Sequence, residues 1–364
     1  MDFIVKQQSD TVTKYKLFGK LTLYKKEIFI SSKTYFLLGF MFKKTYIKPD
    51  NIKTYFLGIK VKDKKIDIIS KIRQYTKNKD FIYYCFHTGD FYYLIQILKN
   101  QKDKFNNTVI ITNFKELKQV LYLFDFDKKW IDEHFIVVPE LFYFSLALYC
   151  DKNGKVLSKM ELDHEKGWIV NGILQKEKRS YFPINKVIHN FLQYSGSLAF
   201  PISSFENYSS TSTVMILPES QFNGNIPVNE LKKIVKELVL MGYHILLNTK
   251  SNVYDECLNE NVKKIFLSYK ETYNIACSCK AIIGIRSGLY DCLQNVANYG
   301  VKCFVIFQNK KYPHYKFFKN FLDWFLSVYS FNNINNTKYF KEFCIIDVAD
   351  IMKIVQEIKR SENA

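Results

Sequence analysis

Within the stretch Lys280-Ala281-Ile282-Ile283-Gly284-Ile285-Arg286-Ser287-Gly288-Leu289-Tyr290-Asp291, the chain changes from a strand pattern to a helix pattern. The apolar run 281–285 predicts a short buried strand of a parallel sheet, and 289–299, closed by Gly300, predicts a helix. In open α/β sheets, ligands bind beyond the carboxyl ends of the strands, where the next helix directs its free N–H groups. The stretch therefore predicts an anion site in a parallel α/β sheet.

Three residues fall at this crossover, and each has two interpretations. Arg286 offers a bidentate clamp, Ser287 a hydroxyl or an N-cap, and Gly288 a backbone that a phosphate approaches closely. The alternative is structural: Arg286 pairs with a carboxylate and Ser287 only caps the helix. Asp291, one turn into the helix, is a candidate to orient Arg286.

A series of βα units surrounds the stretch. Strands are predicted at 214–217, 244–247, 264–267 and 303–307, with helices from Pro227 to Gly242 and over 271–279. Because parallel strands end at one edge of the sheet, the polar residues that follow them are predicted to converge on one crevice. These residues are Glu219, Asn248, Tyr269, Glu271 and Arg286.

An earlier βα series predicts a second parallel sheet. Its strands are expected at 81–86, 108–112 and 135–138, each followed by a helix. The first strand leads into the corner His87-Thr88-Gly89-Asp90, which resembles the corner at Arg286. Asp90 is a helix cap in one interpretation and a functional carboxylate in the other.

Residues 1–80 contain two segments of similar pattern. Segments 15–23 and 54–62 both alternate apolar and polar residues around a glycine, which predicts short strands or hairpins with a turn at Pro49-Asp50-Asn51. Interleaved lysines and aromatic rings suit an anionic membrane interface, and a small basic cap on the first domain is the alternative.

Composition sets the class of protein. The chain has 364 residues, 17% aromatic residues, sparse glycine and proline, and a formal charge of +18, which together predict two folded domains and a polyanionic neighbour. No signal peptide or membrane-spanning run is read, and eight scattered cysteines favour reduced thiols, so a cytoplasmic protein is expected. Four segments are predicted: 1–80, basic and aromatic; 81–205 and 206–330, parallel-sheet domains; 331–364, a strand and a helix.

Two such domains resemble a GT-B glycosyltransferase, with two Rossmann-like domains facing across a cleft. The chain is most similar to bacterial heptosyltransferases, which have a Gly-Asp corner like Gly89-Asp90 and a corner like Ile283-Gly284-Ile285-Arg286-Ser287-Gly288. Where that family has an acidic residue before Ser-Gly, this chain has Arg286. The Arg-Ser-Gly-Leu-x-Asp form looks like that of other lipopolysaccharide and capsule glycosyltransferases, so a nucleotide sugar other than a heptose donor is open.

The resemblance implies roles for the two corners. Asp90 becomes the candidate general base for the acceptor hydroxyl, with His87 as competitor or helper. The helix from Gly288 and the guanidinium of Arg286 stabilise the departing diphosphate. The implied donor-binding residues are Glu219, Asn248, Tyr269, Glu271, Arg286, Ser287, Gly288 and Asp291.

The predicted activity is therefore an inverting, metal-independent transfer from a nucleotide sugar to a lipid-linked or glycan acceptor of a bacterial surface glycan, peripheral to the inner face of the plasma membrane. No cofactor is expected, the nucleotide sugar being a co-substrate. Asp125-Phe126-Asp127 has the spacing of a metal site and is the exception considered. The rivals are a polyanion- or nucleic-acid-binding protein and a nucleotide-sugar epimerase; dispersed lysine and the lack of an RNA motif weigh against nucleic acid.

Overall fold

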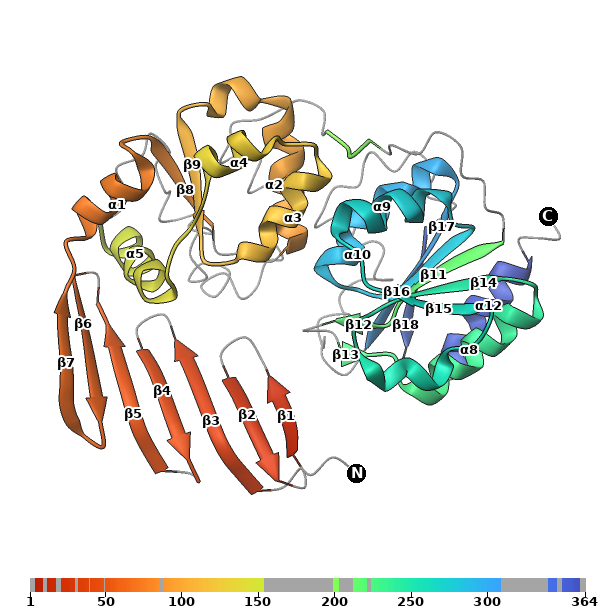
Figure 1. Ribbon diagram of the computed structural model, residues 1–364, viewed down its shortest axis with the longest axis horizontal. Helices are drawn as coiled ribbons and strands as arrows, with labels where there is room; N and C mark the ends of the chain where they lie inside the picture. Colours follow the sequence, from red (N-terminus) through yellow and green to blue (C-terminus); the bar gives the residue numbers. More distant parts are fainter. Residues whose placement is uncertain are drawn as a thin grey trace. The chain divides into compact units, whose positions relative to one another are not determined.

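The computed structural model describes most of the chain as two units (Figure 1). The described residues are 4–8, 12–17, 21–29, 32–38, 40–48, 50–84, 88–153, 199–202, 212–220, 224–308, 340–345 and 349–360. Unit 1 comprises 1–85, 103–115 and 128–180, and unit 2 comprises 86–102, 116–127 and 181–364. The predicted domain boundary near 205 lies outside the described residues.

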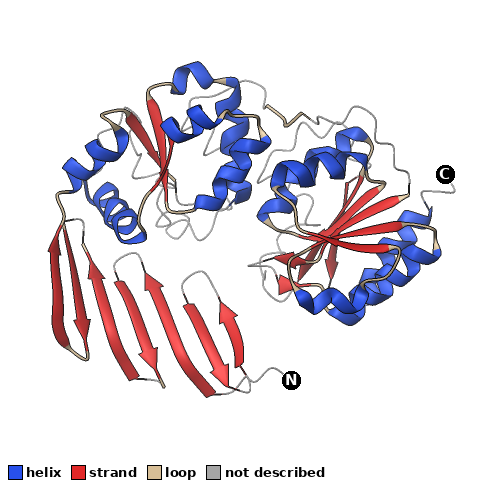
Figure 2. Cartoon of the chain, in the orientation of Figure 1, coloured by secondary structure: helices blue, strands red, loops and turns tan. Residues whose placement is uncertain are grey.

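Unit 1 begins with a seven-stranded antiparallel meander in the order β1 to β7, drawn in red in Figure 2. The strands are β1 (Ile4–Gln8), β2 (Val12–Leu17), β3 (Leu21–Phe29), β4 (Ser32–Leu37), β5 (Phe40–Ile47), β6 (Asn51–Phe56) and β7 (Ile59–Lys65). The predicted turn at Pro49-Asp50-Asn51 joins β5 to β6, where the Lys48 N–H donates to the Asn51 carbonyl at 2.8 Å. The expectation of hairpins in 1–80 is thus confirmed.

A buried lysine ties the meander to the helices of unit 1. Lys33 on β4 is 6% exposed and forms an ion pair with Glu140 of α5 (Glu140–Asn153). Burial lowers the pKa of Lys33, and the hydrogen bond to Glu140 opposes that shift. Its ammonium also lies 5.6 Å from the ring centre of Phe144. The same end of the sheet buries Ile47 and Ile52, so one end of the meander is anchored in a core.

A three-stranded parallel sheet completes unit 1, in the order β10-β9-β8. Its strands are β8 (Asp80–Tyr83), β9 (Thr108–Thr112) and β10 (Phe135–Val137), with helices α1 (Ile68–Thr76) and α4 (Lys128–His134). Tyr143 of α5 stacks on Tyr83 at 4.6 Å and donates a hydrogen bond to the Tyr84 carbonyl. This is the second parallel sheet that the βα series predicts.

Unit 2 is built on a six-stranded parallel sheet in the order β15-β14-β11-β16-β17-β18. Its strands are β11 (Thr213–Leu217), β14 (His244–Asn248), β15 (Val262–Ile265), β16 (Ala281–Ile285), β17 (Lys302–Gln308) and β18 (Phe340–Ile345). Numbered along the chain, this is the 3-2-1-4-5-6 order of a Rossmann fold, and the strand order reverses between β11 and β16.

Helices cover both faces of this sheet (Figure 1). α8 (Val228–Leu240) and α12 (Ala349–Arg360) pack on one face over a core that includes Ile216, Ile283 and Phe304. α9 (Tyr269–Ser278) and α10 (Gly288–Leu293) belong to the other face, where α2 (Thr88–Asn100) contacts α10 and α3 (Lys118–Leu123) contacts α9. Residues 91–98 of α2 are all buried, which is typical of a helix covered on every side.

The predicted α/β class, with two parallel sheets and a small antiparallel N-terminal sheet, is confirmed. Strands 108–112 and 281–285 have the predicted bounds. The strand expected at 264–267 instead spans Val262–Ile265, because Ser268 is already the N-cap of α9. Among the described residues, no helix is long and apolar enough to cross a membrane.

The Lys33–Glu140 pair yields a stability prediction. Glu140→Gln leaves a buried ammonium without its counter-charge and should lower the free energy of unfolding by about 1–3 kcal/mol, less than for a fully buried pair because Glu140 is partly exposed. The measurement is urea denaturation followed by circular dichroism. Glu133→Gln on the exposed side of α4 is the control, and the double variant Lys33→Met/Glu140→Gln should recover part of the loss. Equal stability of Glu140→Gln and wild type would contradict the role of the pair.

Candidate functional site

The two corners singled out in the sequence meet inside unit 2. A Cβ placed on Gly89 would lie 2.2 Å from the Asp291 Oδ2, and one placed on Gly288 would lie 2.4 Å from the Thr88 Cβ. Neither distance is possible for a real side chain, so each corner needs its glycine to admit a side chain of the other. We call the set Thr88, Gly89, Gly288 and Asp291 the α2–α10 junction.

Arg286 lies beside this junction, directly after β16. Its Nη2 is 3.4 Å from the Asp291 Oδ2, and its side chain is only 13% exposed. The Asp291 side chain is 8% exposed, so the pair is largely removed from water. Low exposure to water strengthens the attraction between the two charges. Asp291 is thus the carboxylate with which Arg286 pairs.

Ser287 and Gly288 have structural roles in this conformation. The Ser287 hydroxyl accepts a hydrogen bond from the Tyr290 N–H at 3.1 Å, so it caps α10. The lack of a Cβ at Gly288 leaves room for Thr88. Both structural alternatives considered from the sequence, pairing of Arg286 and capping by Ser287, are therefore observed.

Tyr269 joins the same neighbourhood from the first turn of α9. Its hydroxyl shares a hydrogen bond with the Thr88 side chain, and burial raises the pKa of the phenol. Its backbone N–H donates to the Gln119 Oε1 of α3 at 3.3 Å. Thr88 is the junction residue that the sequence did not single out, although it stands in the quoted corner.

Glu219 lies at the other side of the strand-order reversal. It follows β11 in the short strand β12 (Glu219–Ser220), which pairs with β13 (Gly224–Asn225) and contacts β16. Its carboxylate accepts a hydrogen bond from the Thr249 hydroxyl. Nearby, Tyr254 donates to the Ile226 carbonyl at 3.1 Å, and burial, then the charge of Glu219, raises its pKa. Glu219 and Arg286 thus follow the two strands that flank the reversal point.

Asn248 and Glu271 are held by other contacts. The Asn248 Nδ2 donates to the Thr272 hydroxyl at 3.2 Å, with Asn248 only 9% exposed. Glu271 forms a capping box with Ser268, whose hydroxyl and backbone N–H donate to the Oε2 at 2.6 and 2.9 Å. These hydrogen bonds hold the pKa of the Glu271 carboxyl below its usual range. Glu271 thus acts as a helix cap, and the structure does not bring it to the junction.

The two candidate proton acceptors are only partly described. Asp90 lies in the first turn of α2, one residue after Gly89, and His87 lies outside the described residues. Asp125 of the Asp-x-Asp segment is an ion-pair partner of Lys270. In the described part of the chain, no three His, Cys, Asp or Glu side chains are grouped to hold a metal ion.

A buried polar network behind the junction was not predicted. The Tyr92 hydroxyl donates to the Asn295 Oδ1 at 2.5 Å, the Asn295 Nδ2 donates to the Tyr273 hydroxyl at 3.4 Å, and that hydroxyl donates to the Pro201 carbonyl. Burial raises the pKa of both phenols. The network links α2, α9 and the short helix after α10. In the sequence, the one sign of it was that these polar side chains stand within apolar runs.

Comparison with known proteins finds similarity in structure only. No protein-family profile and no curated protein matches the chain. The E. coli ADP-heptose lps heptosyltransferase II is 12% identical, with 79% of this chain and 100% of that chain covered at a TM-score of 0.49. The E. coli heptosyltransferase WaaC with ADP-2-deoxy-2-fluoro heptose is 9% identical over 78% and 99%, TM-score 0.46.

A nucleotide-sugar enzyme of another kind is also similar. The putative UDP-N-acetylglucosamine 2-epimerase from Listeria monocytogenes is 10% identical over 78% of this chain and 89% of that chain, TM-score 0.44. Two of these three similar structures are heptosyltransferases. The strand order of the six-stranded sheet itself establishes the α/β fold of unit 2.

The junction yields a prediction about its glycines. Gly288→Ala forces its new methyl group against Thr88 and should lower the free energy of unfolding by about 1–3 kcal/mol. Thermal and urea unfolding of the full chain measure the loss. Adding Thr88→Gly removes the obstructing Cβ, so the double variant should be more stable than Gly288→Ala. If the second substitution brings no recovery, the close contact is not the cause.

Proposed function

We propose that the chain is a glycosyltransferase that binds a nucleotide-sugar donor at the strand-order reversal of unit 2. The observation that carries the proposal is the position of Arg286 after β16, beside the reversal point and oriented by Asp291. Ligands of open α/β sheets bind in the crevice at such a reversal. An oriented guanidinium there suits a diphosphate.

The chemistry follows from the charge that develops on the leaving group. Cleavage of the bond between the sugar and the diphosphate leaves negative charge on phosphate oxygens, and an oriented cation in a water-poor site stabilises that charge. Arg286 retains exposed surface while Asp291 fixes its direction. Glu219, which follows β11, and Asn248, the last residue of β14, are proposed to contact the ribose, base or sugar. Tyr269, Ser287 and Gly288 are proposed to line the donor side.

The acceptor is proposed to be a hydroxyl of a lipid-linked or surface glycan, of the lipopolysaccharide or capsule kind. Asp90, assisted by His87, would remove its proton as the sugar is transferred with inversion. This chemistry needs no metal ion, because Arg286 supplies the positive charge. The proposed location is the inner face of the plasma membrane.

Donor binding is tested by thermal stabilisation of the full chain with a panel of nucleoside mono- and diphosphates. One diphosphate at about 100 times its Kd should add about 2.7 kcal/mol of stability. Arg286→Lys keeps the charge but loses the planar guanidinium that can donate two parallel hydrogen bonds to a phosphate. The gain in stability that the nucleotide causes, measured against the same variant without nucleotide, should therefore be much smaller than in the wild type. Arg73→Ala on exposed α1 is the control and should respond as wild type. Absence of stabilisation by every nucleotide would contradict the proposal.

The catalytic base and metal independence are tested on the transfer reaction itself. Once the donor nucleotide is known, Asp90→Asn should lower kcat by about 100-fold or more with donor binding retained, because only proton removal is lost. Glu133→Gln is the matched control. Activity should persist in a chelator. Loss of all activity in the chelator, restored by a divalent cation, would contradict the metal-independent mechanism.

A further inference from the structure

The N-terminal meander carries three similar hairpin connections at one of its ends. Leu17-Phe18-Gly19-Lys20-Leu21 joins β2 to β3, Leu37-Leu38-Gly39-Phe40-Met41 joins β4 to β5, and Phe56-Leu57-Gly58-Ile59 joins β6 to β7. Because neighbouring strands run antiparallel, alternate connections lie at the same end of a meander. This is the end opposite to the one anchored by Ile47 and Ile52.

Large apolar side chains stand exposed at two of these connections. Phe40 is 80% exposed, Ile59 71% and Leu57 66%. Leu37, Leu38 and Val61 are also exposed by more than half. We call these six residues the tip patch. Hydrophobic side chains gathered on a protruding edge mark a contact surface, since isolated exposure is ordinary but clustering is not.

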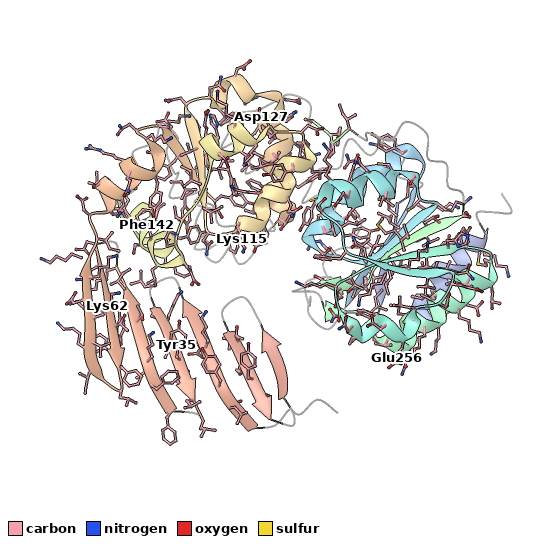
Figure 3. All side chains as sticks on the ribbon, in the orientation of Figure 1. Tyr35, Lys62, Lys115, Asp127, Phe142 and Glu256 are labelled. Carbon is pink, nitrogen blue, oxygen red and sulfur yellow. The ribbon has the colours of Figure 1, made fainter. Side chains whose placement is uncertain are left out.

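The positive charge of the chain is concentrated in the same sheet. Residues 4–65 contain 15 lysines, no arginine and four acidic residues, so this segment supplies a net +11 of the total +18. Lys43, Lys60 and Lys62 are exposed close to the tip patch in sequence. Figure 3 shows Lys62 on β7 and Tyr35 on β4 within this sheet.

Lysines and aromatic rings alternate across the strands. The Lys43 and Lys26 ammonium groups lie 5.5 and 5.9 Å from the ring centre of Tyr35, and that of Lys44 lies 4.6 Å from the ring of Tyr46. Tyrosine and lysine are the residues that hold proteins at the level of lipid headgroups. The apolar tip patch lies at the end of a sheet that carries these lysine and tyrosine side chains. This order matches a bilayer surface, in which polar headgroups cover an apolar interior.

We propose that the tip patch inserts into the headgroup region of an anionic lipid bilayer, with the lysines of the meander contacting lipid phosphates. Each lysine near an anionic surface adds about 1 kcal/mol of attraction, and the apolar side chains add a term that does not depend on salt. A nucleic acid would use the lysines but not the exposed Phe40, Leu57 and Ile59, so it fits the surface less well. The proposed lipid-linked acceptor gives this contact a use, but the binding stands apart from transferase activity.

The experiment is sedimentation of the full chain with two kinds of vesicle. One is phosphatidylcholine alone, and the other also contains roughly 30 mol% of the anionic lipid phosphatidylglycerol. The variant Phe40→Ser/Leu57→Ser/Ile59→Ser should lower partitioning to the anionic vesicles at least tenfold. Leu240→Ser, at an exposed apolar position on α8, is the control and should bind as wild type. Unchanged circular dichroism and thermal midpoint confirm that the triple variant is folded.

Insertion has its own readout. Brominated lipid should quench the fluorescence of the tryptophan introduced by Phe40→Trp but not that of the tryptophan introduced by Leu240→Trp. Each variant is compared with the wild-type chain. Unchanged binding of the triple variant, equal binding to both kinds of vesicle, or displacement of the chain from vesicles by stoichiometric RNA would each overturn the proposal. Nucleotide binding measured on the same triple variant separates the two proposals, because it should remain intact even though vesicle binding is lost.

Discussion

In unit 2, the first turns of α2 and α10 approach so closely that only glycine fits at the two points of contact. Gly89 admits the carboxylate of Asp291, and Gly288 admits Thr88, so the first turns of α2 and α10 interlock. The same carboxylate holds Arg286, and the same threonine shares a hydrogen bond with Tyr269. Two contacts, each between a glycine and a side chain of the other helix, therefore position the carboxylate that pairs with the cation of the proposed donor site. The glycines matter because of what they lack, not because of unusual backbone angles.

Much of the fold was predictable because its elements are decided locally. The strands 108–112 and 281–285 are unbroken apolar runs between polar corners, so their pattern predicts buried parallel strands with few alternatives. Pairing of Arg286 with a carboxylate was one of two interpretations left open by the sequence, and the structure pairs it with Asp291, one turn into the following helix. What the sequence could not predict was that each glycine lies directly against a side chain of the other corner. Gly89 and Gly288 are 199 positions apart, and nothing local indicates that each serves the other.

Glu271, one of the predicted donor-binding residues, has a structural role with a clear physical reason. Glu271 stands three residues after a serine that begins a helix, and this spacing favours a capping box over a ligand contact. Strand end and helix start are also the places where orphan N–H groups need acceptors. Polar residues at these places often serve as structural acceptors. As evidence for ligand binding, a position at a strand end is therefore weaker than a position beside the reversal of strand order. Glu219 and Arg286 satisfy the stronger criterion.

The membership of α2 and α3 in unit 2 has a consequence for synthesis of the chain. Residues 91–98 of α2 are all buried, yet its partner α10 begins at Gly288, nearly two hundred residues later. At about 5–20 residues per second, the helix leaves the ribosome roughly 10–40 s before that partner exists. For roughly half of its translation, a nascent chain of this protein therefore carries α2 without α10, and a chaperone that shields apolar segments has a defined interval in which to act.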